Sequence, residues 1–405
     1  MTRIDARETS LLTVDLEAVA ENTRLLAARA RGRLMAVVKA DGFGHGATDV
    51  ARTSLAHGAI ALGVTSVGEA IALRDEGVAA PLLSWLNPVD ADFDAAVHRG
   101  VDLATPGVGH LHAVAAAARR EGRRARIHLH VDAGMARDGA APGDWAELCR
   151  WARILEQQEL VRVVGVMGHL ACADDVRNPA NAAGRRAFER AVLRAHRSGL
   201  QPRLCHLAAT AACLTDPATH FDMCRVGAGL VGIDPSRTTS LHPAMTLTAP
   251  VVDVRDVSRG TPVGYGHTHV TRRRTRLALL PLGYADGLPR SASGRAAVQL
   301  HGRRHPIVGL ISMDQAVVDV GTAPVRPGDV ATVFGPGMDG EPTVAEWACW
   351  AGTIEHEVVT GIGRRVARRI LPAGSAPPAG ALPASASPAV APAEPDRCEL
   401  AQASR

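Results

Sequence analysis

The sequence predicts an α/β protein, with an N-terminal (β/α)8 TIM-type barrel followed by a C-terminal β-rich domain. Two observations favour this fold class. Short apolar runs alternate with helix-like stretches as far as about residue 240, and beyond it strands joined by Gly- and Pro-bearing turns take over. A third observation, the lack of a GxGxxG motif after the first strand, disfavours an open doubly wound sheet.

The barrel is expected to contain eight strands, each a short apolar or β-branched run bounded by Gly, Asp, Asn or Pro. They cover residues 34–39, 59–65, 81–85, 101–105, 126–132, 162–169, 203–207 and 223–227. Ala-, Arg- and Leu-rich stretches between them are expected to be helices, such as 107–121, 144–158 and 182–198. Strands that alternate with helices pair in parallel through right-handed crossovers, and eight of them indicate a closed barrel.

Composition divides the chain into three parts. We expect the barrel over residues 11–240 and the β domain over 241–371, with residues 1–15 contributing a strand to the second. Residues 372–405 are rich in Ala, Pro and Ser and cannot form a core, so we expect a disordered tail there.

Bulk properties exclude several classes of function. The net charge is only +4 and no basic stripe is interleaved with aromatic residues, so we expect no nucleic-acid partner. No uncharged apolar stretch reaches membrane-spanning length, so we expect no membrane association, and no signal peptide is evident. The seven cysteines form no CxxC pair and show no zinc-site spacing with histidine, which predicts reduced thiols, no metal and a cytoplasmic location.

The motif AVVKADGFGHG, residues 36–46, contains Lys39, the only lysine in the chain. A guanidinium does not lose its proton, so a lysine kept among so many arginines indicates an amine that acts as a nucleophile or base. Lys39 ends the first barrel strand, at the face where barrel enzymes carry catalytic residues. This chemistry is a Schiff base, formed with a substrate carbonyl or with pyridoxal phosphate.

A phosphate site is expected where the last two barrel strands end. In MCRVGAG, residues 223–229, Arg225 precedes Gly227 and Ala228, whose N–H groups can face a phosphate. Thr210 can add a hydroxyl. A packed turn with a structural arginine explains the local sequence equally well.

Taken together, these motifs resemble those of the alanine racemase family. AVVKADGFGHG is similar to the family's pyridoxal-phosphate lysine motif, and six further segments resemble its other motifs in the family's order. They are VDAGMARDG, GVMGHLACADD, CRVGAGLVGIDPS, VGYGHTH, LGYADGLPR and ISMDQAVVDV. The resemblance covers about residues 11–370. It implies the two-domain architecture, pyridoxal phosphate as cofactor, a small amino-acid substrate, and a head-to-tail homodimer with shared active sites.

The resemblance also implies roles for individual residues. Lys39 would hold the cofactor and serve as the base on one face of the substrate, while Tyr265 would act on the opposite face from the partner subunit. Arg225 would contact the pyridine nitrogen and leave it unprotonated, and His169 would lie beside the ring. The residues implied in substrate binding are Arg137, Tyr284, Met313 and Asp314.

Three positions depart from the family pattern. Phe43 stands where the family usually has a phosphate-binding tyrosine, and Arg364 stands near a second one. His130 occupies the place where many members carry a carbamylated lysine that orients Arg137. Each lost neutral hydrogen bond costs roughly 1 kcal/mol, and Arg364 can offer a charged one instead. We therefore expect weaker or rearranged cofactor binding without loss of catalysis.

The combined prediction is a pyridoxal-phosphate-dependent racemase that interconverts L- and D-alanine with two bases on opposite faces. A racemase of serine or of a broader range of amino acids stays open, as does a specialised role such as resistance to an antibiotic analogue. Two alternatives belong to other classes: an amino-acid decarboxylase on the same barrel, and a non-catalytic cofactor-binding protein. The first is expected to carry a catalytic cysteine, and the second has no need of a domain bearing Tyr265.

Overall fold

The computed structural model describes residue 6, residues 9–31 and residues 33–374, so the predicted tail over 372–405 lies almost wholly outside the described residues. The chain forms two compact units. The first, which we call the barrel unit, comprises Leu12–Thr246 and Val359–Ile362. The second, the β unit, comprises Leu247–Val358 and the segments at both ends of the described chain.

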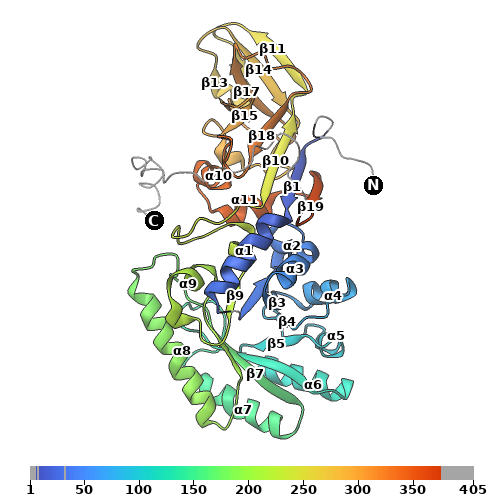
Figure 1. Ribbon diagram of the computed structural model, residues 1–405, viewed down its shortest axis with the longest axis vertical. Coiled ribbons are helices and arrows are strands. Elements are labelled where there is room, and N and C mark those ends of the chain that lie inside the picture. Colours follow the sequence, from blue (N-terminus) through green and yellow to red (C-terminus); the bar gives the residue numbers. More distant parts are fainter. Residues whose placement is uncertain (1–5, 7–8, 32, 375–405) are drawn as a thin grey trace. The chain divides into compact units, whose positions relative to one another are not determined.

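Eight parallel strands form the sheet of the barrel unit, in the order β8-β7-β6-β5-β4-β3-β2-β9 (Figure 1). They are β2 (Leu34–Val37), β3 (Ala59–Val64), β4 (Leu82–Ser84), β5 (Asp102–Thr105), β6 (Ala125–His130), β7 (Val161–Met167), β8 (Leu204–His206) and β9 (Cys224–Val226). All eight predicted strands are present, which confirms the TIM-type fold class. Buried side chains from several of these strands form a common apolar cluster of Met35, Ala61, Leu83, Ala104 and Met167.

Helices connect these strands. They are α1 (Leu16–Arg29), α3 (Ala47–Ala56), α4 (Val67–Asp75), α5 (Phe93–His98), α6 (Val108–Glu121), α7 (Trp145–Gln157), α8 (Pro179–Arg197) and α9 (Thr210–Thr215). Figure 1 shows α4 to α8 along the outer side of the strands. Local sequence sets their ends: Ser66 and Glu69 form a capping box that starts α4, and Gly122 ends α6 with a left-handed φ of 60°.

The sheet differs from the expected closed barrel at one seam. Among the described residues, β8 and β9 form no ladder, and single hydrogen bonds join their flanks instead. The Asp222 N–H donates to the Cys205 carbonyl and the Arg225 N–H donates to the Ala208 carbonyl, each with an N···O distance of 2.9 Å. Each strand has only three residues, and the Asp222 carboxylate accepts the Cys205 N–H at 2.8 Å, so little backbone is left for a ladder.

The other main sheets of the chain are a six-stranded sheet, β16-β15-β18-β10-β1-β19, and a three-stranded sheet, β11-β14-β17. The strands are β1 (Leu11–Asp15), β10 (Met245–Pro250), β11 (Asp253–Val257), β14 (Thr275–Leu280), β15 (Ala297–Leu300), β16 (Arg303–Pro306), β17 (Ala316–Gly321), β18 (Val330–Phe334) and β19 (Ala367–Leu371). A short hairpin joins β12 (Pro262–Val263) to β13 (His269–Val270). The β-rich character predicted for this part of the chain is confirmed.

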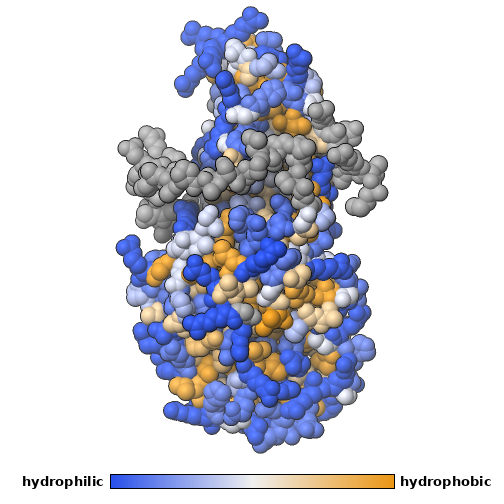
Figure 2. Space-filling view, in the orientation of Figure 1, coloured by the Kyte–Doolittle hydropathy of each residue, from blue (hydrophilic) through white to orange (hydrophobic). Residues whose placement is uncertain are grey.

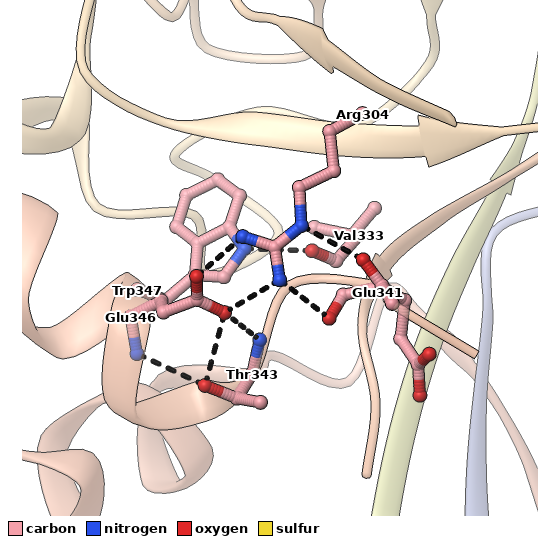
Figure 3. A network of polar contacts seen from close by, with 7 residues as sticks. Arg304, Val333, Glu341, Thr343, Glu346 and Trp347 are labelled. Carbon is pink, nitrogen blue, oxygen red and sulfur yellow. Dashed lines mark hydrogen bonds and ion pairs between the residues drawn. The ribbon is translucent and has the colours of Figure 1, made fainter. Parts of the chain in front are cut away.

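Helix α10 (Val344–Ala351) is fastened to this sheet by a polar network (Figure 3). Arg304 of β16 forms an ion pair with Glu346, and Glu346 also closes a capping box with Thr343. The indole N–H of Trp347 donates to the Val333 carbonyl of β18 at 2.7 Å. These contacts hold the helix against two strands through residues of the β unit itself. The remaining helix of this region is α11 (Glu355–Gly361).

The surface and the cysteines bear on two further expectations. Figure 2 shows hydrophobic side chains gathered in patches among hydrophilic ones on one face of the barrel unit. No helix within the described ranges is long and apolar enough to cross a bilayer. Cys149, Cys172, Cys205, Cys213 and Cys224 have free thiols. Cys349 is disulfide-bonded, so the expectation that all seven thiols are reduced is wrong.

Candidate active site

Lys39 lies where β2 ends, at the start of a short turn, α2 (Lys39–Phe43), with left-handed backbone. Ala40, Asp41 and Phe43 have φ values of 51°, 55° and 58°. This region costs roughly 1–2 kcal/mol per residue when a side chain is present, so neighbouring contacts must hold the turn. One such contact comes from Glu69, whose Oε1 accepts the Ala40 N–H at 2.8 Å.

The environment of Lys39 favours its neutral amine. Burial and the positive charge of Arg137 lower the pKa of Lys39, and together they outweigh the opposing effect of Glu69. A neutral amine is the form that attacks a carbonyl or takes up a proton. The electrostatics of this position therefore suit the role predicted for the only lysine.

The loop after β6 carries Arg137 and is built around one carboxylate. Asp132 Oδ1 accepts the N–H groups of residues 134–136 at 2.8, 2.7 and 3.2 Å. Nδ1 of His130, which is buried, lies 3.4 Å from Asp138 Oδ2. These contacts shape the loop. They include His130, which stands where many family members carry a carbamylated lysine.

Arg225 is buried on β9 and is oriented mainly by backbone carbonyls. Its guanidinium donates to the carbonyls of Gly168 at 2.6 Å and His206 at 2.7 Å. Nη2 of Arg225 also lies 3.4 Å from Nδ1 of His169. Burial lowers the pKa of Arg225 to about 10, so the group is still a cation at neutral pH. It can donate hydrogen bonds at the barrel mouth but cannot accept one.

His169 is neutral in this setting. Burial and the positive charges of Arg225, Arg137 and Lys39 lower the pKa of His169 to about 3. The same interactions show that four predicted site residues of the barrel unit share one electrostatic environment. The sequence placed them on four different strand ends, and the barrel brings them together.

The depressed pKa of His169 predicts a pH-dependent loss of stability. Between about pH 6.5 and pH 3 the unfolded chain binds a proton on this histidine and the folded chain does not, so stability falls as the pH falls. His169→Asn is expected to make the unfolding free energy less dependent on pH by about 1.4 kcal/mol per pH unit between pH 6 and 4. Urea unfolding at several pH values measures this slope, and equal slopes for variant and parent would contradict it.

A buried chain of hydrogen bonds continues from Arg225 through the barrel interior. Because Arg225 only donates, its 2.9 Å contact with His206 Nδ1 makes that nitrogen the acceptor and leaves the proton on Nε2. Nε2 of His206 lies 2.9 Å from His128 Nδ1, and His128 Nε2 lies 3.5 Å from Asp102. Burial opposes ionisation of Asp102, but hydrogen bonds from His128 and Arg126 outweigh it and lower the pKa of that carboxyl.

The turn after β9 gathers the predicted phosphate residues. The Gly229 N–H donates to Thr210 Oγ1 at 3.2 Å, so the hydroxyl keeps its own proton to donate. A Cβ on Gly227 would lie 2.6 Å from two ring atoms of Phe43, so the aromatic ring packs directly against this turn. Ala228 begins the short 3-10 turn that follows. The main-chain N–H groups, the hydroxyl, the buried guanidinium and the lysine amine are the donor set that a phosphate, a pyridine nitrogen and an aldehyde require, so pyridoxal phosphate fits.

In the β unit, the predicted substrate residues lie on two joined loops. The Tyr284 N–H donates to the Ser312 carbonyl at 3.0 Å, and the next N–H donates to the Met313 carbonyl at 2.9 Å. Arg365, in the segment just before β19, forms ion pairs with Asp286 at 3.2 Å and with Asp314 at 2.7 Å, and so links both loops to this segment. The structure thus brings Tyr284, Met313 and Asp314 together within this unit.

Tyr265 stands on the surface of the β unit. It begins a 3-10 turn, Tyr265–His267, that follows Gly264, and its side chain is 72% exposed. An exposed phenol at a fixed turn can be presented to another chain. Arg364 is also exposed in this unit, and its role toward the cofactor stays a prediction.

Five contributors to the site were missed by sequence reasoning: Glu69, Asp102, His128, His206 and Arg365. The S-x-x-E spacing of a capping box is a sequence signal for Glu69. That spacing does not reveal the hydrogen bond that Glu69 also accepts from the Lys39 turn. His206 lies near the end of the strand predicted over 203–207, and Arg365 is adjacent to Arg364, which was predicted instead. Asp102 had no local signal.

Two family models match the chain. The model of the alanine racemase N-terminal domain matches residues 14–235, and that of the alanine racemase C-terminal domain matches residues 244–370. Alanine racemase of Thermobifida fusca is 46% identical over 359 residues, which are 88% of this chain and 96% of that protein.

Solved structures give the same result. Alanine racemase from D-cycloserine-producing Streptomyces lavendulae has a TM-score of 0.88 and 41% identity, covering 90% of this chain and 97% of that one. Alanine racemase from Bartonella henselae, with covalently bound pyridoxal phosphate, has a TM-score of 0.81 and 26% identity, covering 90% of this chain and 99% of that one.

Proposed function

The chain belongs to the alanine racemase family of pyridoxal-phosphate-dependent isomerases, and we propose that it interconverts L- and D-alanine with Lys39 and Tyr265 as its two bases. The observation that carries this proposal is the lone lysine. Its pKa is lowered, and Arg225 and His169 share its electrostatic environment. Serine and a broader range of amino acids remain the alternative substrates.

Each residue has a distinct part in this proposal. Bound pyridoxal phosphate supplies the electron-accepting ring that makes the α-proton of an amino acid acidic. Lys39, whose pKa is lowered by burial and Arg137, exchanges a proton with one face of the α-carbon. Arg225 can donate hydrogen bonds but cannot accept one, so it leaves the ring nitrogen unprotonated. An unprotonated ring limits side reactions at the α-carbon. Neutral His169 lies beside this pair and adds no charge.

The second face of the α-carbon requires a group on the other side of the substrate, because one base alone would return the proton with retention. We assign it to Tyr265 of a partner subunit in a homodimer, since the phenol is exposed on the β unit and fixed by its turn. We keep the barrel domain at 11–240 and the β domain at 241–371. Five described cysteines have free thiols and Cys349 does not, and on this balance we propose the cytoplasm.

Incubation with L-alanine in heavy water tests the proposed activity. We expect α-deuterium incorporation together with loss of optical rotation, and no release of carbon dioxide. No exchange would favour a non-catalytic cofactor-binding protein, exchange without loss of rotation would contradict a two-base racemase, and carbon dioxide would indicate a decarboxylase. Parallel assays with L-serine and a larger amino acid rank the substrates.

Two adjacent arginines should have separable effects. Arg365→Ala removes the tie between Asp286 and Asp314 and so loosens the substrate loops, and we expect the KM for alanine to rise about tenfold with unchanged cofactor affinity. Arg364→Ala is expected to weaken cofactor binding instead, because Phe43 offers the phosphate no hydroxyl. Cofactor titration followed by absorbance, together with steady-state kinetics, measures both. The same effect from both variants would contradict the separate assignments.

A further inference from the structure

Three side chains with soft or borderline ligand atoms meet at the seam of the barrel unit. They are Cys213 on α9, His220 at the end of the turn η1 (Pro217–Thr219), and Cys224 on β9. One ligand atom from each lies within 4.8 Å of the other two. Both thiols are free, and both cysteines are almost completely buried, as is most of His220. The proposed racemase chemistry uses none of them.

The orientation of His220 matches that of a metal ligand. Its Nε2 lies 3.0 Å from the Cys213 carbonyl, and a carbonyl only accepts, so this nitrogen carries the proton. Nδ1 is therefore the unprotonated nitrogen available as the third ligand atom. Histidines that bind metal commonly donate their other ring N–H to a backbone carbonyl in this way, which fixes the ring and its tautomer.

We propose that Cys213, His220 and Cys224 bind a zinc ion. Two thiolates and one imidazole are a ligand set that zinc takes in a tetrahedral site, with a water molecule in the fourth position. Two thiolates neutralise Zn²⁺, so the site carries no net charge into a buried position, whereas Cu⁺ would leave one negative charge there. The site goes beyond the racemase activity, and its ion takes no part in the racemisation chemistry.

The location gives this ion a structural task. The chain from the end of β8 to the first residue of β9 holds all three ligands, and β8 and β9 are the neighbours that no ladder joins within the described part of the sheet. A zinc ion here links α9, the end of η1 and the start of β9, and so orders the segment that connects β8 to β9. Cys224 directly precedes Arg225, so the ion also steadies the strand that positions the buried guanidinium. The C-x6-H-x3-C spacing matches no usual zinc motif, so the sequence predicted no metal here, and it is the fold that brings the three ligand atoms together.

Zinc content and coordination test the proposal on the full chain with its cofactor bound. After removal of metal with a chelator and dialysis against zinc chloride, we expect one zinc per chain by elemental mass spectrometry. X-ray absorption should show two sulfur ligands at about 2.3 Å and nitrogen or oxygen ligands at about 2.0–2.1 Å. At zinc concentrations well above the dissociation constant, the Tm should rise by on the order of 5–10 °C.

Variants separate this site from adventitious binding. Cys213→Ser and His220→Gln should each lose more zinc affinity than the roughly 10–100-fold that removal of an outer partner costs. Cys205→Ser, a buried cysteine on the neighbouring strand β8, should keep one zinc per chain and the Tm rise. If Cys213→Ser fails to fold, the coordination shell of the parent protein still decides. Three results would overturn the proposal: zinc without sulfur ligands, both cluster variants retaining as much zinc as the parent, or a Cys213–Cys224 disulfide with no zinc.

Discussion

Lys39→Arg is expected to lose racemisation by at least about 10⁴-fold in kcat, the largest effect of any single substitution in this chain. The variant keeps the positive charge and much of the side-chain length. It lacks an amine that can be deprotonated, so it can neither bond covalently to the cofactor nor act as the base. Burial and Arg137 lower the pKa of the native lysine, which eases the loss of the proton that arginine cannot release.

Because this lysine is the only one, the attachment site can be measured without ambiguity. Borohydride reduction of the parent enzyme should add one pyridoxyl group to the peptide containing Lys39, as read by mass spectrometry. The same treatment of Lys39→Arg should leave that peptide unmodified. Substantial racemisation by the variant, or a pyridoxyl group on any other internal peptide of the parent, would refute the assignment.

Tyr265→Phe is expected to lower racemisation about 10²- to 10⁴-fold in both directions, because inversion needs a proton donor on each face. The equilibrium constant between enantiomers is unity, so kcat/KM must fall equally for both. Exchange of the α-proton is not bound by this constraint. In the variant, Lys39 should still exchange the proton of one enantiomer with solvent, whereas the other enantiomer loses exchange.

Initial rates of deuterium incorporation into L-alanine and D-alanine, read by mass spectrometry, give this asymmetry. Tyr284→Phe is the matched variant, since it removes the only other phenol hydroxyl from the chain. We expect it to alter the KM while exchange stays balanced between enantiomers. Balanced exchange in Tyr265→Phe would sink the two-base assignment, and the parent's cofactor absorbance in both variants checks that the site has folded.

The local elements of this protein follow from its sequence. All eight barrel strands were predicted within about two residues of their observed ends, because each is a short apolar run between turn-forming residues. The helices over 107–121, 144–158 and 182–198 appear as α6, α7 and α8 for the same reason. Lys39 stood out by composition alone. Its position at a strand end then followed from the barrel rule, without any contact being known.

Contacts between distant segments could not be predicted in this way. Arg225, His206, His128 and Asp102 form one hydrogen-bonded chain although they come from four strands, and this alignment depends on the stagger of neighbouring strands. The expected closure of the barrel by a ladder also failed, because β8 and β9 are too short and Asp222 occupies the backbone between them.

The sequence by itself determined the order of strands and helices, the reactive lysine and the motifs that mark the family. Only the tertiary structure decided which charges lower the pKa of Lys39, which carboxylates Arg365 joins, and that Cys213, His220 and Cys224 share one site. The physical reason is one of range. Backbone preference and hydrophobic periodicity act over a few residues and are written locally, whereas electrostatics and ligand geometry act through space between residues that the fold alone brings together.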